Sequence, residues 1–209
     1  MGFSPNYAGD ILDRRNHSAD IDPNQNCSIL ITDLPGDTTV KSLFSALASK
    51  IAPFDRVYAC YVNGPDASRA FTTAAAKVVT LTRSGAEALY NGIASGRFVI
   101  NDKTAKAVWN RIMVAPQTLP NFDSHVLVIQ GHPALANLQT LEQFLGVLGP
   151  NFDTECVVTK KIERPFSSES IIEWRFGSYR AQAAAVKRVL GVYLPALKVR
   201  FGADPCARS

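Results

Sequence analysis

The feature that most constrains this fold is a pattern that occurs twice, with the two copies 98 residues apart. Each copy opens with a short apolar run ending in a proline, SILITDLP at residues 28–35 and VLVIQGHP at residues 126–133. Apolar residues then recur at helical spacing, and Leu43 and Leu141 hold the same place in the two copies. The repeat indicates a diverged duplication, so we expect two domains of one architecture.

Beyond the first strand and helix, both copies continue in the same order. Apolar alternation and turn residues predict a further strand pair, a second helix and a last strand in each. The predicted strands are residues 56–62, 74–81 and 105–111 in the first copy and 154–159, 170–176 and 196–201 in the second. This order predicts the α+β class: two ferredoxin-like βαββαβ domains, each a four-stranded antiparallel sheet with both helices on one face. The other face of each sheet stays open to a partner.

Composition divides the chain into five parts. Residues 1–26 hold two Arg and four Asp without an apolar period, and we expect a disordered arm of net charge −2. The first domain, 27–113, has a net charge of +4, and the second, 124–203, together with a tail at 204–209, has +3. A linker at 114–123 contains two prolines. Both domains are therefore mildly basic, which permits an anionic partner.

Several function classes are not expected. No apolar run approaches the roughly 18 residues of a membrane span, and we expect an intracellular protein, nuclear or cytoplasmic. The four cysteines and three histidines have no metal-clip spacing, so no metal is predicted. The sequence also lacks a nucleophile elbow, a phosphate-binding glycine loop and a dinucleotide fingerprint. We therefore predict neither an enzyme nor a bound cofactor.

The phrases SILITDLP, AKVVTLTRSGAEALYNGI and IIEWRFGSYRAQAAAVKRVL resemble the RNA recognition motif (RRM) family, present in two tandem divergent copies. The resemblance covers residues 27–113 and 124–203. It implies that single-stranded RNA binds the open sheet faces, where aromatic side chains stack on bases and basic residues hold phosphates.

The aromatic positions that this resemblance implies are mostly not aromatic here. On the first strand they fall at Leu30 and Val128. On the third strand they fall at Ala75 and Lys77 in the first domain, and the second domain has Ile171 and Glu173 there. Trp174 and Phe176 alternate with these residues and are predicted to face the core. Stacking contributes roughly 1–3 kcal/mol per base to the binding free energy, so other residues must supply this contribution.

In the first domain, replacement contacts can come from Tyr58 or Tyr61, and strand register decides which tyrosine faces out. The candidate RNA contacts of this domain are Leu30, Tyr58, Tyr61, Arg69, Lys77, Lys106, Asn110 and Arg111. In the second domain Glu173 repels phosphate, while basic residues crowd the loop after the second strand. The candidate contacts there are Val128, Lys160, Lys161, Arg164, Ile171, Arg175, Lys198 and Arg200.

Two functions follow from these patterns. The first is a non-catalytic RNA-binding protein, in which two sheets joined by a linker of about ten residues share one strand. The alternative is a protein-interaction module that binds a protein partner, or packs its two sheets together, through faces that lack aromatics. Ser84 and Ser178 are interpreted as helix caps and the two tryptophans as core residues.

Overall fold

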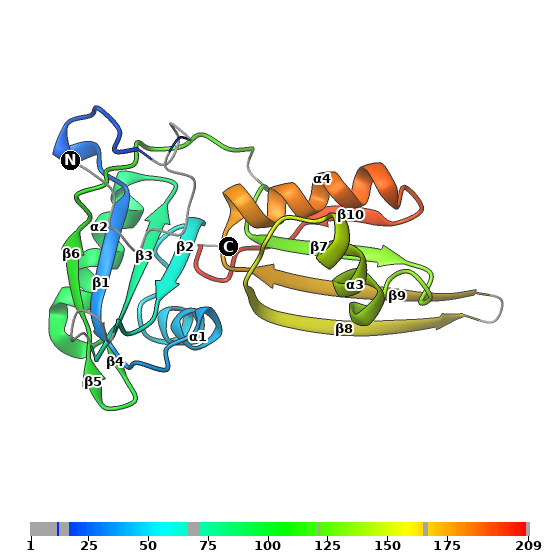
Figure 1. Cartoon of the computed structure of the whole chain (residues 1–209), viewed down its shortest axis with the longest axis horizontal. Coiled ribbons are helices and arrows are strands. Elements are labelled where there is room, and N and C mark those ends of the chain that lie inside the picture. Colours follow the sequence, from blue (N-terminus) through cyan, green and yellow to red (C-terminus); the bar gives the residue numbers. More distant parts are fainter. Residues whose placement is uncertain (1–11, 13–16, 67–71, 121, 165–166, 208–209) are drawn as a thin grey trace.

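The computed structural model describes residues 12, 17–66, 72–120, 122–164 and 167–207. The chain forms two domains that lie side by side (Figure 1). The first contains β1 (Ser28–Leu34), α1 (Val40–Lys50), β2 (Val57–Asn63), β3 (Ala74–Thr80), α2 (Arg83–Gly92), η4 (Ile93–Arg97), β4 (Val99–Ile100), β5 (Lys103–Thr104) and β6 (Lys106–Trp109). The second contains β7 (Val126–Gly131), α3 (Leu138–Leu148), β8 (Thr154–Arg164), β9 (Ser167–Phe176), η5 (Tyr179–Ala183), α4 (Ala184–Tyr193) and β10 (Lys198–Phe201). A short helical turn, η2 (Pro23–Gln25), precedes β1.

Each main sheet is four-stranded and antiparallel, with the order β2-β3-β1-β6 in the first domain and β10-β7-β9-β8 in the second. The two orders are equivalent, which confirms the predicted α+β class with two four-stranded antiparallel sheets. The small hairpin of β4 and β5 turns at Asn101 and Asp102, both at positive φ.

The two cores are separate apolar clusters between each sheet and its helices. In the first domain Ile29, Phe44 and Leu89 are fully buried. In the second domain Trp174 and Phe176 stack with their ring centroids 5.1 Å apart, which confirms the prediction that both face inward. Burial of these side chains fixes which face of each sheet stays open.

Helix starts differ from the serine caps that the sequence suggested. The N-cap of α2 is Thr82, whose hydroxyl accepts from the Gly85 amide, and Ser84 already lies inside the helix. Ser178 precedes η5 but makes no capping hydrogen bond, because its hydroxyl bonds to the other domain. The Ser84 prediction was wrong, because the helix begins two residues earlier. Ser178 does occupy the N-cap position of η5, but its hydroxyl contacts Cys60, a tertiary partner that local sequence cannot reveal.

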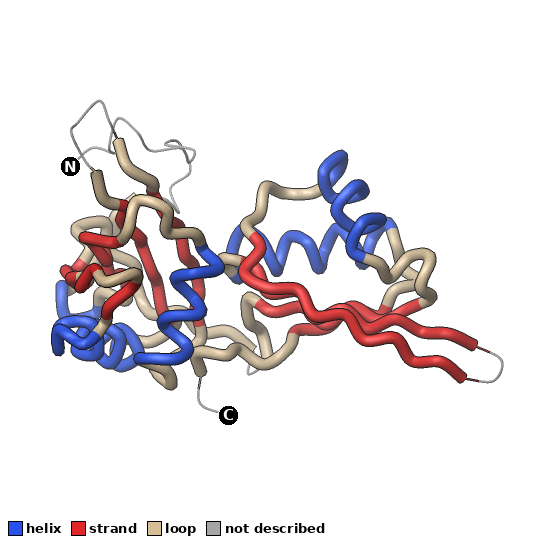
Figure 2. Tube along the Cα trace, turned by 90° about the horizontal axis from the view of Figure 1, so that it is seen from below, coloured by secondary structure: helices blue, strands red, loops and turns tan. Residues whose placement is uncertain are grey.

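The β8–β9 hairpin is longer than predicted and projects away from the first domain (Figure 2). Residues 164 and 167–168, expected in a loop, continue the two strands, and Arg164 pairs with Ser167. Lys160 and Lys161 therefore lie on a strand rather than in a crowded loop. Alternation along the strand then sends these two side chains to opposite faces.

The segment that precedes β1 packs on the first domain over its described part. Ala19 N donates to Met113 O, and Arg83 donates to the carbonyl oxygens of Pro23 and Asn26. Asn26 is buried, and its side-chain oxygen accepts from the amides of Ser28 and Val114. Residues 18–26 are thus held by hydrogen bonds, while most of the expected arm lies outside the described residues.

The chain after β10 runs between the two domains (Figure 1). Cys206 is fully buried in the core cluster of the first domain, and its carbonyl accepts from the Phe54 amide. The two sheets do not pack face to face: among the described elements, α1 and β2 contact β8 and η5 across the junction. Neither open face is therefore covered by the other sheet.

Candidate nucleic-acid interface

Strand register defines the open face of the first domain. Tyr61 pairs with Lys77, Lys77 with Leu30, and Leu30 with Val108, so four side chains form one row across the sheet. We call it the Tyr61 row. Cross-strand neighbours lie roughly 5 Å apart at Cβ, close enough for one ligand to touch several. The row ends are the most accessible, with Tyr61 40% exposed and Val108 46% exposed.

A bulge in β2 decides which tyrosine faces outward. Val57 pairs with Thr80 and Ala59 with Val79, so Tyr58 is an extra residue between them. Because of it Cys60 enters the core and Tyr61 points to the open face. Tyr58 instead packs near Val114 and Tyr179. Of these two tyrosines, Tyr61 is therefore the one on the open face.

The electrostatics of the Tyr61 row are set by burial and by the positive charge of Arg180. Burial, and next the positive charge of Arg180, lower the pKa of Lys77. Burial raises the pKa of Tyr61, so its phenol is neutral at physiological pH and does not repel phosphate. A phosphate near Lys77 would favour its charged form.

The other basic candidates of this domain are more engaged. Lys106 lies beside the row and forms an ion pair with Asp33, at 3.0 Å. The Asn110 side chain accepts from the Ile112 amide, and its backbone joins β6 to Ser28. Arg111 is exposed at the end of that strand. Arg69 lies outside the described residues.

The linker covers one end of the open face. Cys27 N donates to Val114 O, and Val114 packs on the small cluster of Cys27, Ala59 and Val79. Further on, Gln117 N donates to Leu81 O. The part of the face that remains open is thus the Tyr61 row and the residues toward Lys106.

The equivalent row of the second domain has different chemistry. Val158 pairs with Glu173, Glu173 with Val128, and Val128 with Arg200. We call it the Val158 row. Arg175 binds the Glu173 carboxylate at 2.7 Å and lies 3.8 Å from Glu155. Burial opposes the charge on Arg175, but these carboxylates raise its pKa overall. This arginine is therefore occupied by acids of its own domain.

Val128 was expected to be an exposed contact, and the register does place it on the open face. It is only 8% exposed, however, because the chain at Gly202 lies against it. A Cβ at Gly202 would approach Val126 Cγ1 to 2.8 Å and Val128 Cγ2 to 3.1 Å. Glycine at this position thus lets the chain pass close over the sheet.

The rim of the second face is basic. Lys160 pairs with Ile171, Ile171 with Gln130, and Gln130 with Lys198, which places Lys160 and Lys198 on opposite edges of one row. Both lysines and Arg200 are exposed, while Ile171 is half-buried. Lys161 is exposed on the opposite face of β8. For Arg164 only the backbone pairing is described.

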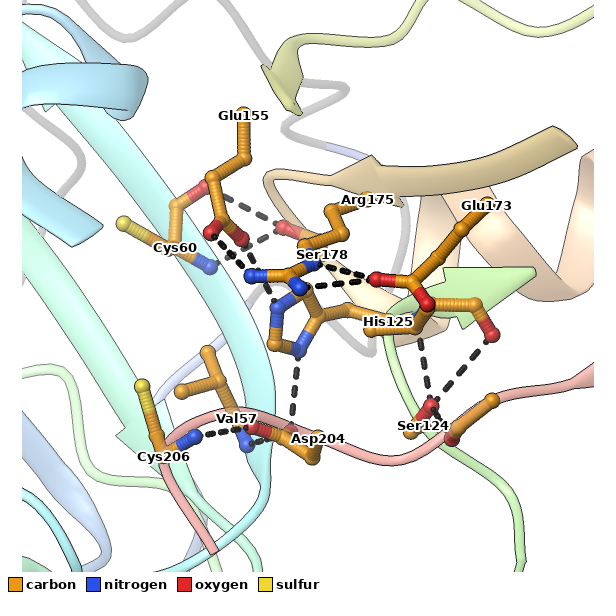
Figure 3. A network of polar contacts seen from close by, with 12 residues as sticks. Val57, Cys60, Ser124, His125, Glu155, Glu173, Arg175, Ser178, Asp204 and Cys206 are labelled. Carbon is orange, nitrogen blue, oxygen red and sulfur yellow. Dashed lines mark hydrogen bonds and ion pairs between the residues drawn. The ribbon is translucent and has the colours of Figure 1, made fainter. Parts of the chain in front are cut away.

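A buried polar network, which no sequence pattern predicted, lies at the domain junction (Figure 3). The ring of His125 contacts Asp204 at 2.9 Å and Glu155 at 3.1 Å, and packs 4.9 Å from the Phe44 ring of the first domain. Asp204 also accepts from Val57 N of β2. Burial alone would lower the pKa of His125, but the charge and hydrogen bonds of the two acids raise it to about 9.

A second junction contact closes the free edge of β2. The Ser178 hydroxyl accepts from Cys60 N at 2.9 Å and donates to Cys60 O at 3.1 Å. This contact between Ser178 and Cys60 could be predicted only by knowing which edge of the first sheet packs against η5. Together, Ser178 and Asp204 fix the second domain against β2, beside the Tyr61 row.

Other chemistry finds little support in the described part of the chain. Trp109 is not a free stacking platform, because it stacks on Tyr90 at 5.2 Å and lies under Arg83 at 3.7 Å. Within the described residues, no cluster of His, Cys, Asp and Glu could hold a metal ion. No helix in the same residues is long and apolar enough to span a membrane.

No family model and no curated protein sequence matches this chain. Among solved structures, a Sex-lethal protein/RNA complex is 14% identical, covers 85% of this chain and 99% of its own, and has a TM-score of 0.33. Sex-lethal RNA recognition domains 1 and 2 from Drosophila melanogaster are 13% identical, cover 85% and 100%, and have a TM-score of 0.31. The C. elegans NONO-1 homodimer is 17% identical, covers 84% and 61%, and has a TM-score of 0.29. Matches at such low identity say nothing about what this chain binds.

Proposed function

We propose that this chain is a non-catalytic, intracellular protein that binds single-stranded RNA, chiefly on the open face of its first domain. The observation that carries the proposal is the Tyr61 row, in which an exposed aromatic ring adjoins a lysine with no acid opposite it in the register. Aromatic stacking with a nearby cation is the usual means of holding single strands. Leu30 and Val108 extend the row with apolar surface for a second base.

The second domain contributes less in this proposal. Its central row holds an acid, and the adjacent Arg175 is paired with that acid. Lys160, Lys198 and Arg200 on the rim can attract phosphate. Neither of the two rows that these residues end contains an aromatic side chain. We expect this face to add electrostatic attraction rather than base contacts.

The test is fluorescence polarisation with a labelled randomised single-stranded RNA pool, titrated at several salt concentrations. Wild-type protein is expected to bind at micromolar concentration or below, and Lys77→Gln to flatten the salt dependence by about 0.7 in log–log slope. The matched control is Lys41→Gln, which removes an exposed lysine from α1 on the opposite side of the sheet. Equal binding by both variants would contradict the proposed face.

Exposed apolar residues on both faces favour a second candidate, a protein-interaction module. Val108 is 46% exposed and Val158 is 52% exposed. Each lies on an edge strand, at one end of its row. Exposed apolar groups of this kind mark contact surfaces when they are contiguous. Absence of RNA binding at low salt would favour this candidate over the first.

A further inference from the structure

Arg180 of the second domain lies where the junction meets the open face of the first domain. Two residues before it, Ser178 is held by two hydrogen bonds to the backbone of Cys60, the neighbour of Tyr61 on β2. The ring of Tyr179 lies 6.1 Å from that of Tyr58 on the same strand. The start of η5 is therefore fixed along the edge of β2.

The charge of Arg180 reaches the Tyr61 row. This positive charge adds to the effect of burial in lowering the pKa of Lys77, and it partly opposes the rise in the pKa of Tyr61 that burial causes. Two other basic residues of these faces have acids as neighbours: Lys106 has Asp33, and Arg175 has Glu173. Here the neighbour of a half-buried lysine is a second cation, and their repulsion is relieved by an anion between them.

Resting on the proposed function, we propose that Arg180 binds a phosphate of the RNA strand whose base stacks on Tyr61, so that the site is built by both domains. Arg180 already engages other groups of the chain, and its five N–H donors leave capacity for a phosphate oxygen as well. The RNA would therefore cross the junction at the β2 edge, with its phosphate between Lys77 and Arg180. Docking of the domains becomes a condition for full affinity.

The experiment compares Arg180→Gln with Arg188→Gln, an exposed arginine of α4, by the same polarisation assay. Arg180→Gln is expected to weaken binding at low salt roughly tenfold and to lower the log–log salt slope by about 0.7. Arg180→Lys, which keeps the charge, should restore the slope. Thermal melts of all three variants check that the junction is intact.

An abasic RNA backbone of equal length separates phosphate contacts from base contacts. Arg180→Gln should weaken binding of the abasic strand by the same factor as that of the normal strand, whereas Tyr61→Ala should affect only the normal strand. If wild type binds RNA and Arg180→Gln behaves like Arg188→Gln, the two-domain site is wrong and the proposed function stands. If wild type binds no RNA, both are overturned.

Discussion

The Tyr61 row and the Val158 row occupy equivalent positions of two copies of one fold, yet they present opposite chemistry. In the first domain the row reads Tyr61, Lys77, Leu30 and Val108, and in the second Val158, Glu173, Val128 and Arg200. Core positions of the two copies are apolar in both, because a change there destabilises the fold. Open-face positions are free of that constraint, so the two copies differ there: one row holds a lysine, and the other holds an acid that is paired with Arg175.

The largest expected effect comes from disrupting the buried polar network that holds one domain against the other. Asp204→Ala removes one acid from buried His125 and leaves Val57 N without its acceptor. Loss of one partner from a buried ionic network costs about 3–5 kcal/mol. Urea unfolding should show this loss, with Asp37→Ala, at an exposed position, as the control. A loss below about 1 kcal/mol would mean that the network does not join the domains.

Alkaline pH should loosen the same network. The pKa of His125 rises from 6.5 to about 9 on folding, so its contribution is complete below pH 6.5 and is lost as pH rises through about 9. Burial raises the pKa of the nearby thiols of Cys60 and Cys206, so they do not ionise in this window. The shift corresponds to roughly 3 kcal/mol.

The measurement is the unfolding free energy at pH values from 6 to 9.5, for wild type and for His125→Gln. The difference between the two proteins should shrink as pH rises. A difference that stays constant over this range would show that His125 is not charged at the junction.

RNA affinity gives the direct comparison of the two rows. Tyr61→Ala should weaken binding of single-stranded RNA by roughly 1–3 kcal/mol, because it removes the stacking ring. Val158→Ala changes the equivalent position of the second domain and should alter affinity less than about twofold. Polarisation titrations of both variants at one salt concentration make the test. Equal losses would show that the two faces bind alike.

The smallest expected effect makes the second row more like the first. Glu173→Gln removes the acid at the centre of the Val158 row and loosens its hold on Arg175. RNA affinity should rise by roughly 0.5–1 kcal/mol, a factor of about 2–5. Glu142→Gln, an exposed change on α3, controls for net charge. If both variants gain equally, the position of Glu173 on the sheet has no special effect.

Sequence patterns were sufficient to predict the duplicated architecture and the orientation of the central strands. Alternation along β1, β3 and β9 was enough to place Leu30, Lys77 and Glu173 outward and Trp174 inward, because burial of one face dictates a period of two. It did not decide between Tyr58 and Tyr61. That choice depends on a bulge, which arises from pairing between β2 and β3 and leaves no local signal.

The tertiary structure alone decided which charges are available and how the domains meet. Lys106 and Arg175 resemble any exposed base in the sequence, yet each has an acid beside it across or along its sheet. His125, Ser178 and Asp204 join segments separated by 79 and 118 residues, counted from His125 to Asp204 and from Cys60 to Ser178. Such contacts depend on the docking of two finished domains, and a pattern of neighbouring residues along the chain carries no record of them.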